Sequence, residues 1–341
     1  MRVTRVMVAA GSLIALALLV WPSSLALPPS VSIAAEPPDK ASPSEANNAY
    51  VGPETCQQCH EDSFNHFAKT RMGRLFLKHP RDEWEKRGCE SCHGPGKAHV
   101  DAGGGKGVGG IISFAKDSPT PVRERNAICL RCHERKARLF WEGSPHDNRG
   151  LACTNCHLIM RDILATGAPG VPRQGLTKPD AGLAKPTVIE VCRQCHLRQA
   201  AQQMSNAHMP VREGKMDCTS CHNPHGTVTE KLLKANSLND TCFQCHADKR
   251  GPFLWEHPPV VESCANCHSP HGSNHENMLL FPKPRLCQQC HIEQRHPTSP
   301  QTTPTAPATR LPGEFIAFRA CVTCHRNIHG SNHPSGYRFQ R

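Results

Sequence analysis

The stretches C-L-R-C-H at residues 129–133 and C-F-Q-C-H at residues 242–246 are two of ten C-x-x-C-H strings in this 341-residue chain. All 20 cysteines belong to these strings, and none is left over. Two thiols separated by two residues suit addition to the two vinyl groups of one porphyrin, and the histidine that follows can bind its iron. The strings therefore predict ten covalently bound c-type haems.

Other uses of such strings fit the pattern less well. A single C-x-x-C-H could be half of a zinc site or a redox dithiol, but ten strings without a stray cysteine disfavour both. A disulfide framework needs no histidine after every second cysteine. Numbered 1 to 10 along the chain, the motifs are Cys56/Cys59/His60, Cys89/Cys92/His93, Cys129/Cys132/His133, Cys153/Cys156/His157, Cys192/Cys195/His196, Cys218/Cys221/His222, Cys242/Cys245/His246, Cys264/Cys267/His268, Cys287/Cys290/His291 and Cys321/Cys324/His325.

The composition restricts the fold class. Only 38% of the residues are hydrophobic and 5% aromatic, which excludes a polytopic membrane protein and a large aliphatic core. With about 31 residues of mature chain per haem, the porphyrins must supply much of the apolar interior. Loops rich in Gly and Pro separate the motifs. We expect a mainly irregular chain with short α-helices and little or no β-sheet, arranged as an elongated wire of haems.

The amino terminus resembles an export signal. Arg2 and Arg5 precede an apolar run over residues 6–20, with cleavage expected after Ala26, Ala34 or Ala35, and there is no twin arginine. An uncleaved anchor is the alternative. We expect a Sec-type signal peptide over 1–35, a flexible lead-in over 36–50 and a haem-binding domain over 51–341. The domain divides into five tandem two-haem units, at roughly 51–110, 111–165, 187–230, 237–277 and 282–341.

A second periodic pattern predicts the sixth iron ligands. Each odd-numbered motif is followed after a long step by another possible ligand, and each even-numbered motif after a short step. The long steps in the middle of the chain are 11 to 13 residues, whereas His225 and His271 follow their motif histidines by three. The candidates are Met72, His99, His146, Met160, His208, His225, His257, His271, His296 and His329.

Two candidates depart from histidine. Met72 and Met160 occupy positions where the pattern places histidine elsewhere, and methionine as an axial ligand raises the reduction potential. Gap filling against a porphyrin is the alternative role of either methionine. His66 or His79 could replace Met72. Four histidines fit no ligand position and are assigned to hydrogen bonding or the surface: His66, His79, His275 and His333.

The short step has a geometric consequence. A histidine three residues after a proximal histidine cannot reach the opposite face of the same haem. His225 and His271 must therefore ligate the iron of another haem, so that ligands cross-brace neighbouring sites.

Several strings resemble one family. C-H-G-P-G-K-A-H at 92–99, C-H-N-P-H-G at 221–226, C-H-A-D-K-R-G-P-F-L-W-E-H at 245–257, L-C-Q-Q-C-H at 286–291 and I-H-G-S-N-H-P-S-G at 328–336 are similar to the MtrA/DmsE family of periplasmic decahaem cytochromes. The resemblance runs from about Tyr50 to Arg341 and implies bis-histidine ligation through His99, His146, His208, His225, His257, His271, His296 and His329.

The resemblance also implies partners and a location. Members of this family insert into an outer-membrane β-barrel porin and pass electrons between periplasmic or inner-membrane cytochromes and an outer-surface multihaem cytochrome or an extracellular mineral. Metal reduction or Fe(II) oxidation would be the process served. At Met72 and Met160 this sequence has methionine where members of the family have histidine. These departures suit a higher-potential haem at one end of the electron path.

Two classes of function follow. The first is a non-enzymatic electron conduit in which every iron is six-coordinate. The second is a multihaem oxidoreductase acting on a small nitrogen or sulfur oxyanion at an open haem, for which the first and fourth haems are the candidates. The net charge of +11 does not indicate a nucleic-acid partner, because loss of Arg2 and Arg5 and about −1 from each ferric haem leave the protein near neutral.

Overall fold

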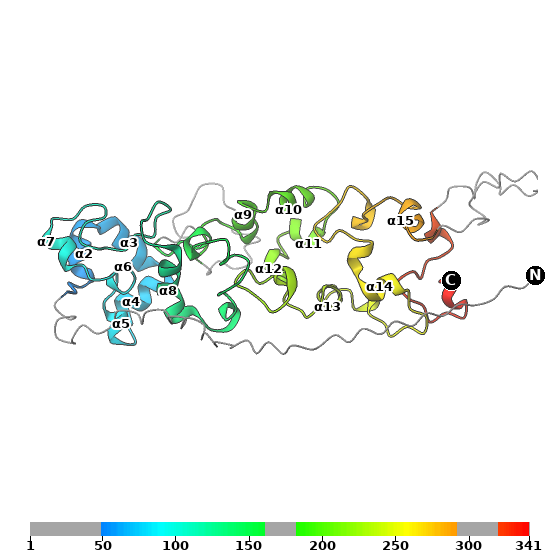
Figure 1. Cartoon of the computed structure of the whole chain (residues 1–341), viewed down its shortest axis with the longest axis horizontal. Coiled ribbons are helices and arrows are strands. Elements are labelled where there is room, and N and C mark those ends of the chain that lie inside the picture. Colours follow the sequence, from blue (N-terminus) through cyan, green and yellow to red (C-terminus); the bar gives the residue numbers. More distant parts are fainter. Residues whose placement is uncertain (1–48, 161–181, 292–319, 341) are drawn as a thin grey trace, which may run out of the picture. The chain divides into compact units, whose positions relative to one another are not determined.

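The chain forms short helices joined by loops (Figure 1). The computed structural model describes residues 49–160, 182–291 and 320–340, which all belong to one compact unit, Ser44–Arg341. The predicted signal peptide and almost all of the lead-in lie outside the described residues. The described α-helices are α2 (Pro53–Cys59), α3 (Glu61–Lys69), α4 (Arg71–Lys78), α5 (Glu83–Lys86), α6 (Glu90–His93), α7 (Lys97–Asp101), α8 (Val122–His133), α9 (Val188–Arg193), α10 (Leu197–Gln202), α11 (Met209–Arg212), α12 (Cys218–Cys221), α13 (Leu238–Phe243), α14 (Pro258–Glu262) and α15 (Arg285–Gln288).

Single turns of 3-10 helix complete the regular structure. They are η1 (Lys136–Arg138), η2 (Cys153–Asn155), η3 (Glu230–Leu232), η4 (Ala247–Lys249), η5 (Cys264–Asn266), η6 (Glu276–Met278), η8 (Cys321–Thr323) and η9 (Gly336–Arg338). Extended pairing in the described ranges consists of isolated bridges. The prediction of short helices with little or no sheet is confirmed for these residues. None of the described helices is long and apolar enough to span a membrane.

Each C-x-x-C-H motif starts on a helical turn, and the residues in front of several motifs explain why. Thr187 caps α9 through its hydroxyl, and Glu190 returns the bond to the Thr187 backbone N–H. Asp217 caps α12, and the Ser237 hydroxyl caps α13. A Ser, Thr or Asp side chain satisfies backbone N–H groups that a helix start leaves unpaired. These caps start a helix at or just before the cysteines.

The even-numbered motifs share a second element, a return of the chain against the motif histidine. Isolated antiparallel bridges join His157 to Leu183, His222 to Leu233 and His268 to Leu279. Beside the first of them, the Leu158 N–H donates to the Gly182 carbonyl at 2.7 Å. The same local fold therefore recurs at motifs 4, 6 and 8.

Few apolar side chains are buried by protein alone. In the described ranges the buried ones are Phe67, Phe76, Trp141, Ala152, Val188, Val191 and Leu279. By contrast, Val228 and Leu254 are 78% and 74% exposed. A chain of this length normally buries most of its large apolar residues. The exposed ones are available to pack against a bound porphyrin.

Candidate haem-binding sites

The local geometry of the motifs brings three haem-binding groups to one side of a helical turn. In nine of the ten motifs, the backbone N–H of the motif histidine donates to the carbonyl of the first cysteine at 2.9–3.0 Å. Motif 3 has the same residues inside α8. Residues three and four apart on a helical turn lie on the same face. Both thiols and the imidazole can therefore approach one porphyrin.

The cysteines are available for attachment. All 20 are described as free thiols, and none is in a disulfide. The first cysteines of the two motifs in each unit hydrogen-bond through their thiols. The pairs are Cys56–Cys89, Cys129–Cys153, Cys192–Cys218, Cys242–Cys264 and Cys287–Cys321.

The electrostatics of these thiols reflect the same contacts. The thiol hydrogen bond and burial raise the pKa of Cys192, whereas the same bond lowers that of Cys218 to about 7. Burial first, and then the neighbouring thiol, raises the pKa of one cysteine in each pair that joins consecutive units. Those pairs are Cys92–Cys132, Cys156–Cys195, Cys221–Cys245 and Cys267–Cys290. The thiols of successive C-x-x-C-H motifs thus lie near one another in sequence order.

Cys324 departs from the other second cysteines of the even-numbered motifs. It is exposed, whereas its four counterparts are half-buried: Cys92, Cys156, Cys221 and Cys267. The second cysteines of the odd-numbered motifs are exposed as well: Cys59, Cys132, Cys195, Cys245 and Cys290. The tandem spacing predicts the same role for Cys324 as for its counterparts, but the structure gives it a more open environment than theirs.

Seven motif histidines face a second histidine at a nearly constant separation. The ring centroids lie 6.0–6.5 Å apart in the pairs His60–His99, His196–His146, His157–His225, His246–His208, His222–His271, His291–His257 and His268–His329. An iron bound by two imidazole nitrogens at about 2 Å each places the ring centroids about 6 Å apart. The histidine pairs therefore fit the two axial positions of a haem iron.

The pairing follows a regular order along the chain. His146, which follows motif 3, faces the histidine of motif 5, and His208, which follows motif 5, faces that of motif 7. The short-step histidines point the other way: His225, which follows motif 6, faces His157 of motif 4. His271 and His329 repeat this backward step, and His257 repeats the forward step. His225 and His271 thus face the histidines of other motifs and not those of their own.

Hydrogen bonds orient the imidazoles. Nδ1 of His146, His208 and His257 lies 2.7, 3.1 and 2.9 Å from the carbonyl oxygens of Pro224, Pro270 and Ile328. A carbonyl only accepts, so Nδ1 carries the proton and Nε2 is left for a metal. The proximal rings do the same with other carbonyls: His93 with Ile112, His222 with Lys231, His268 with Asn277 and His325 with Arg338.

Burial keeps the imidazoles in the form that binds iron. Burial is the main cause that lowers the pKa of His225 to about 4, and it also lowers the pKa of His93, His271 and His329. A neutral imidazole has the free lone pair that a metal needs. These side chains are therefore ready to ligate at neutral pH.

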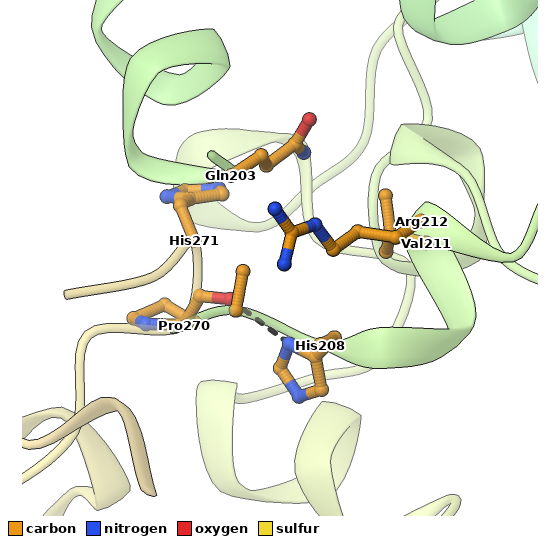
Figure 2. Close-up of a pocket in the computed structure, with 7 residues that line it drawn as sticks. Gln203, His208, Val211, Arg212, Pro270 and His271 are labelled. Atoms are coloured by element: carbon orange, nitrogen blue, oxygen red, sulfur yellow. Dashed lines mark hydrogen bonds between the residues drawn. The ribbon is translucent and has the colours of Figure 1, made fainter. Parts of the chain in front are cut away.

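Figure 2 shows how closely the ligands of neighbouring sites lie. His208, which faces the histidine of motif 7, and His271, which faces that of motif 6, line one small pocket. His208 bonds to the carbonyl of Pro270, the residue before His271. The Arg212 guanidinium lies between them and donates to the Met204 carbonyl at 3.3 Å. One local cluster thus positions ligands for two sites.

A glycine directly after three of the short-step histidines, His225, His271 and His329, is a feature that we did not predict from the spacing. A Cβ on Gly226 would lie 1.9 Å from the Phe140 carbonyl oxygen, and one on Gly272 would lie 2.2 Å from the Gln202 carbonyl oxygen. The φ angles are +112° and +123°, which favour glycine. The H-G dipeptide, repeated at 225, 271 and 329, was the available sequence signal.

Other predicted residues are not brought into such pairs. Among the described residues, neither His93 nor His133 faces a second imidazole at this separation. Met72 lies half-buried on α4, and Met160 is half-buried three residues after His157. His66 has a buried Nδ1 without a partner among the described residues. His296 lies outside the described residues.

The histidines without a predicted ligand position have local roles or lie at helix ends. The backbone N–H of His275 and of His333 binds the hydroxyl of Ser273 and Ser331, respectively. His79 caps the C-terminal end of α4.

Comparison with known proteins agrees with this geometry. The family model "Doubled CXXCH motif" matches residues 208–251 and 257–296, and "Cytochrome c-type protein NrfB-like" matches residues 89–163. The multiheme cytochrome MtrA of Shewanella baltica (strain OS185) is 37% identical over 298 residues, which cover 87% of this chain and 84% of the relative. This chain belongs to the MtrA family of multihaem c-type cytochromes. As a member of that family it binds several haems covalently through its C-x-x-C-H motifs, and its function is electron transfer.

Proposed function

We propose that this MtrA-family chain binds ten haems and conducts electrons across the outer membrane as the periplasmic part of a porin–cytochrome complex. The 20 motif cysteines attach the haems, and the ten motif histidines are the proximal ligands. When bound, haem supplies the one-electron Fe(III)/Fe(II) couple. The distal ligands are the seven facing histidines, together with His296, Met72 and Met160.

The series of neighbouring motif thiols carries this proposal. The thiols of consecutive motifs lie near enough to affect one another's pKa, alternately through the first and the second cysteines, from Cys56 to Cys321. Electron transfer between cofactors needs such proximity, whereas an enzyme needs one accessible site. A series of ten neighbours suits conduction from one end of the chain to the other.

The histidine pairs support conduction over catalysis. Facing imidazoles, as in His222–His271 at 6.0 Å, occupy both axial positions and leave no place for a substrate. The Nδ1–H bonds to backbone carbonyls hold each ring in one tautomer and orientation. Little rearrangement is then needed when the oxidation state changes.

Similarity to MtrA supports the location and partners. The signal-like amino terminus favours export to the periplasm by the Sec route. We infer that the chain inserts into an outer-membrane β-barrel porin, which surrounds it. Periplasmic or inner-membrane cytochromes would exchange electrons at one end, and an outer-surface multihaem cytochrome or a mineral at the other.

Three measurements test the proposal. The intact mass of the native protein should equal the processed chain plus ten haems. The protein should co-purify from outer membranes with a large β-barrel. Liposomes that contain the complex should then pass electrons from an internal reductant to an external acceptor. A count below ten, or recovery only as a free periplasmic protein, would contradict the conduit.

A second function is favoured by one observation. His93 and His133 face no second imidazole among the described residues, and an iron with an open position there could reduce a small nitrogen or sulfur oxyanion. The first and fourth haems do not keep an open position as expected, because His60 and His157 each face a second histidine. The conduit predicts a wholly low-spin oxidised protein that does not bind carbon monoxide rapidly when reduced. A high-spin resonance together with rapid carbon monoxide binding would favour the oxidoreductase.

A further inference from the structure

The three cross-braced ligand pairs share one arrangement. Each joins a long-step histidine, found after an odd motif, to a short-step histidine, found after the even motif three places later. The pairs are His146 with His225, His208 with His271, and His257 with His329. In each pair, Nδ1 of the long-step histidine binds the carbonyl just before the short-step histidine.

The same arrangement has a fourth position at its N-terminal side. The pairs follow motifs 3 and 6, 5 and 8, and 7 and 10, so the preceding pair would have its long-step residue after motif 1 and its short-step residue after motif 4. These residues are Met72 and Met160. By the forward and backward steps of the other pairs, Met72 belongs with motif 3 and Met160 with motif 2. The two methionines thus replace both members of one cross-braced pair.

The motif histidines show the matching gap. His133 of motif 3 and His93 of motif 2 face no second imidazole among the described residues. The other motif histidines that the structure places opposite a histidine belong to motifs 1 and 4 to 9. Two sites without a histidine partner therefore coincide with the two methionine positions.

Packing brings the segment after motif 1 to motif 3. The Arg131 guanidinium, inside motif 3, lies 3.7 Å from the centroid of the Trp84 ring. Trp84 belongs to α5, which packs against α4, the helix that carries Met72. The forward step from motif 1 to motif 3 therefore has contact support of its own.

Packing also brings motif 4 to motif 2. The Thr154 hydroxyl, inside motif 4, donates to the Phe114 carbonyl at 3.4 Å. The Phe114 ring packs edge-on against His93, with the centroids 5.4 Å apart. Met160 follows four residues after Cys156 in the same motif. The backward step from motif 4 to motif 2 is thus supported by contacts independent of the first.

From this register we infer that Met72 ligates the iron held by His133 and Met160 ligates the iron held by His93. The inference rests on the proposed haem binding at all ten motifs. A thioether has no N–H, so Met72 cannot make the bond to the Ile159 carbonyl that a histidine would make. Motifs 2 and 3 become an adjacent pair of His/Met centres, with reduction potentials above those of the bis-histidine sites.

The first experiment counts the methionine ligands. The ferric holoprotein should show the far-red charge-transfer band of methionine-ligated haem, and Met72→His and Met160→His should each halve it. The double variant should lose it. Met204→His is the control, because Met204 is 67% exposed and occupies no ligand position, and its band should equal that of the parent. A band unchanged in either single variant would overturn the assignment of that methionine.

The second experiment identifies the irons. Cys129→Ala with Cys132→Ala removes the haem of motif 3 and should halve the band. In this background, adding Met72→His should change nothing, whereas adding Met160→His should abolish the band. The reverse result would overturn the register. If the nine-haem variant does not accumulate, the holoprotein structure decides, since Met72 Sδ must then bond to the iron that His133 binds.

Failure of the inference can be told apart from failure of the proposed function. An intact mass that corresponds to ten haems, together with wholly low-spin spectra but no charge-transfer band, would be consistent with the conduit and would contradict the methionine assignment. Another low-spin ligand, such as His66 or His79, would then serve these sites. A mass short of ten haems would instead contradict the proposed function.

Discussion

Residues 49–101 and residues 186–291 both contain C-x-x-C-H motifs, but they differ in how far protein side chains cover these motifs. In the first region, coloured blue to cyan in Figure 1, α3 packs on α2 and α4 and buries Phe67 and Phe76. Among the described residues of this region, one large apolar side chain, that of Val100, is more than one-third exposed. In the second region the large apolar side chains that are more than one-third exposed are those of Leu197, Met204, Met209, Val228, Leu254, Trp255, Val261, Leu280 and Phe281.

Buried polar groups show the same contrast. In the first region the carboxylate of Glu90 is 2% exposed and accepts backbone N–H bonds from Val51, Gly52 and Gly96. In the second region the long-range links include bonds from distal histidines to carbonyls, close backbone contacts at glycine, and bonds of the Asn239 side chain to the Val260 carbonyl and the Cys264 N–H. The second region leaves more large apolar side chains exposed, and these are expected to pack only when haem is bound.

Removal of haem should have the largest effect on this contrast. In a full-length chain made without haem attachment, we expect amides of α10 and α13, which carry no buried side chain, to exchange at the rate of an unfolded chain. Amides of α3 and α4 should retain protection, because Phe67 and Phe76 still pack. Hydrogen exchange with mass spectrometry measures both regions in one sample. Equal loss of protection in the two regions would show that the first also depends on haem.

Glu90→Ala should have the next largest effect. It leaves three backbone N–H groups without the acceptor that they have now, and we expect a loss of about 4 kcal/mol in stability. Glu90→Gln keeps one oxygen and should lose about half as much. Denaturant unfolding of the holoprotein measures both losses. Glu83→Ala on α5 is the control, since its side chain is 83% exposed. A similar loss in Glu90→Ala and Glu83→Ala would contradict the structural role of Glu90.

Gly226→Ala tests the close backbone contact outside the first region. The new Cβ would lie 1.9 Å from the Phe140 carbonyl oxygen, and φ is +112°, so we expect a loss of about 3 kcal/mol. Gly143→Ala is the matched control, because φ is +74° there and nothing lies within 4 Å of the added carbon. It should cost only about 1 kcal/mol.

The reduction potential gives a second measure of the same variant. Gly226 follows His225, so its displacement should also shift the potential of the site that contains His157. Redox titration should show one shifted component in Gly226→Ala and none in Gly143→Ala. Equal losses of stability in the two variants, without a shift, would mean that the Phe140 contact does not hold the ligand.

The sequence was sufficient to predict the short helices, the C-x-x-C-H motifs and the candidate ligands, because each is a local pattern. It did not predict the pairs. His146 faces His196 and His157 faces His225, and these partners are far apart in the sequence. The lengths of the loops between them are compatible with several other pairings. Step length alone excluded only a ligand's own motif, as for His225. The sequence also did not predict the carbonyl groups that accept the Nδ1–H bonds, because any residue could contribute the carbonyl that Pro224 offers to His146.

The smallest expected effect is a pH dependence confined to the first region. Nε of Arg81 donates to Oε1 of Glu85 at 2.8 Å, and this bond holds the pKa of the Glu85 carboxyl below its ordinary value of 4.5. A depressed folded pKa stabilises α5 above the unfolded pKa, and that stability is lost as the pH falls through the folded value. The protection factors of the amides in α4 and α5 should therefore fall below about pH 4.5 in the parent, by roughly threefold more than in Glu85→Gln. Glu83→Gln, with its carboxylate exposed on the same helix, should follow the parent. If Glu85→Gln also follows the parent, the Arg81 bond does not stabilise this region, and its helices are held by apolar packing and Glu90.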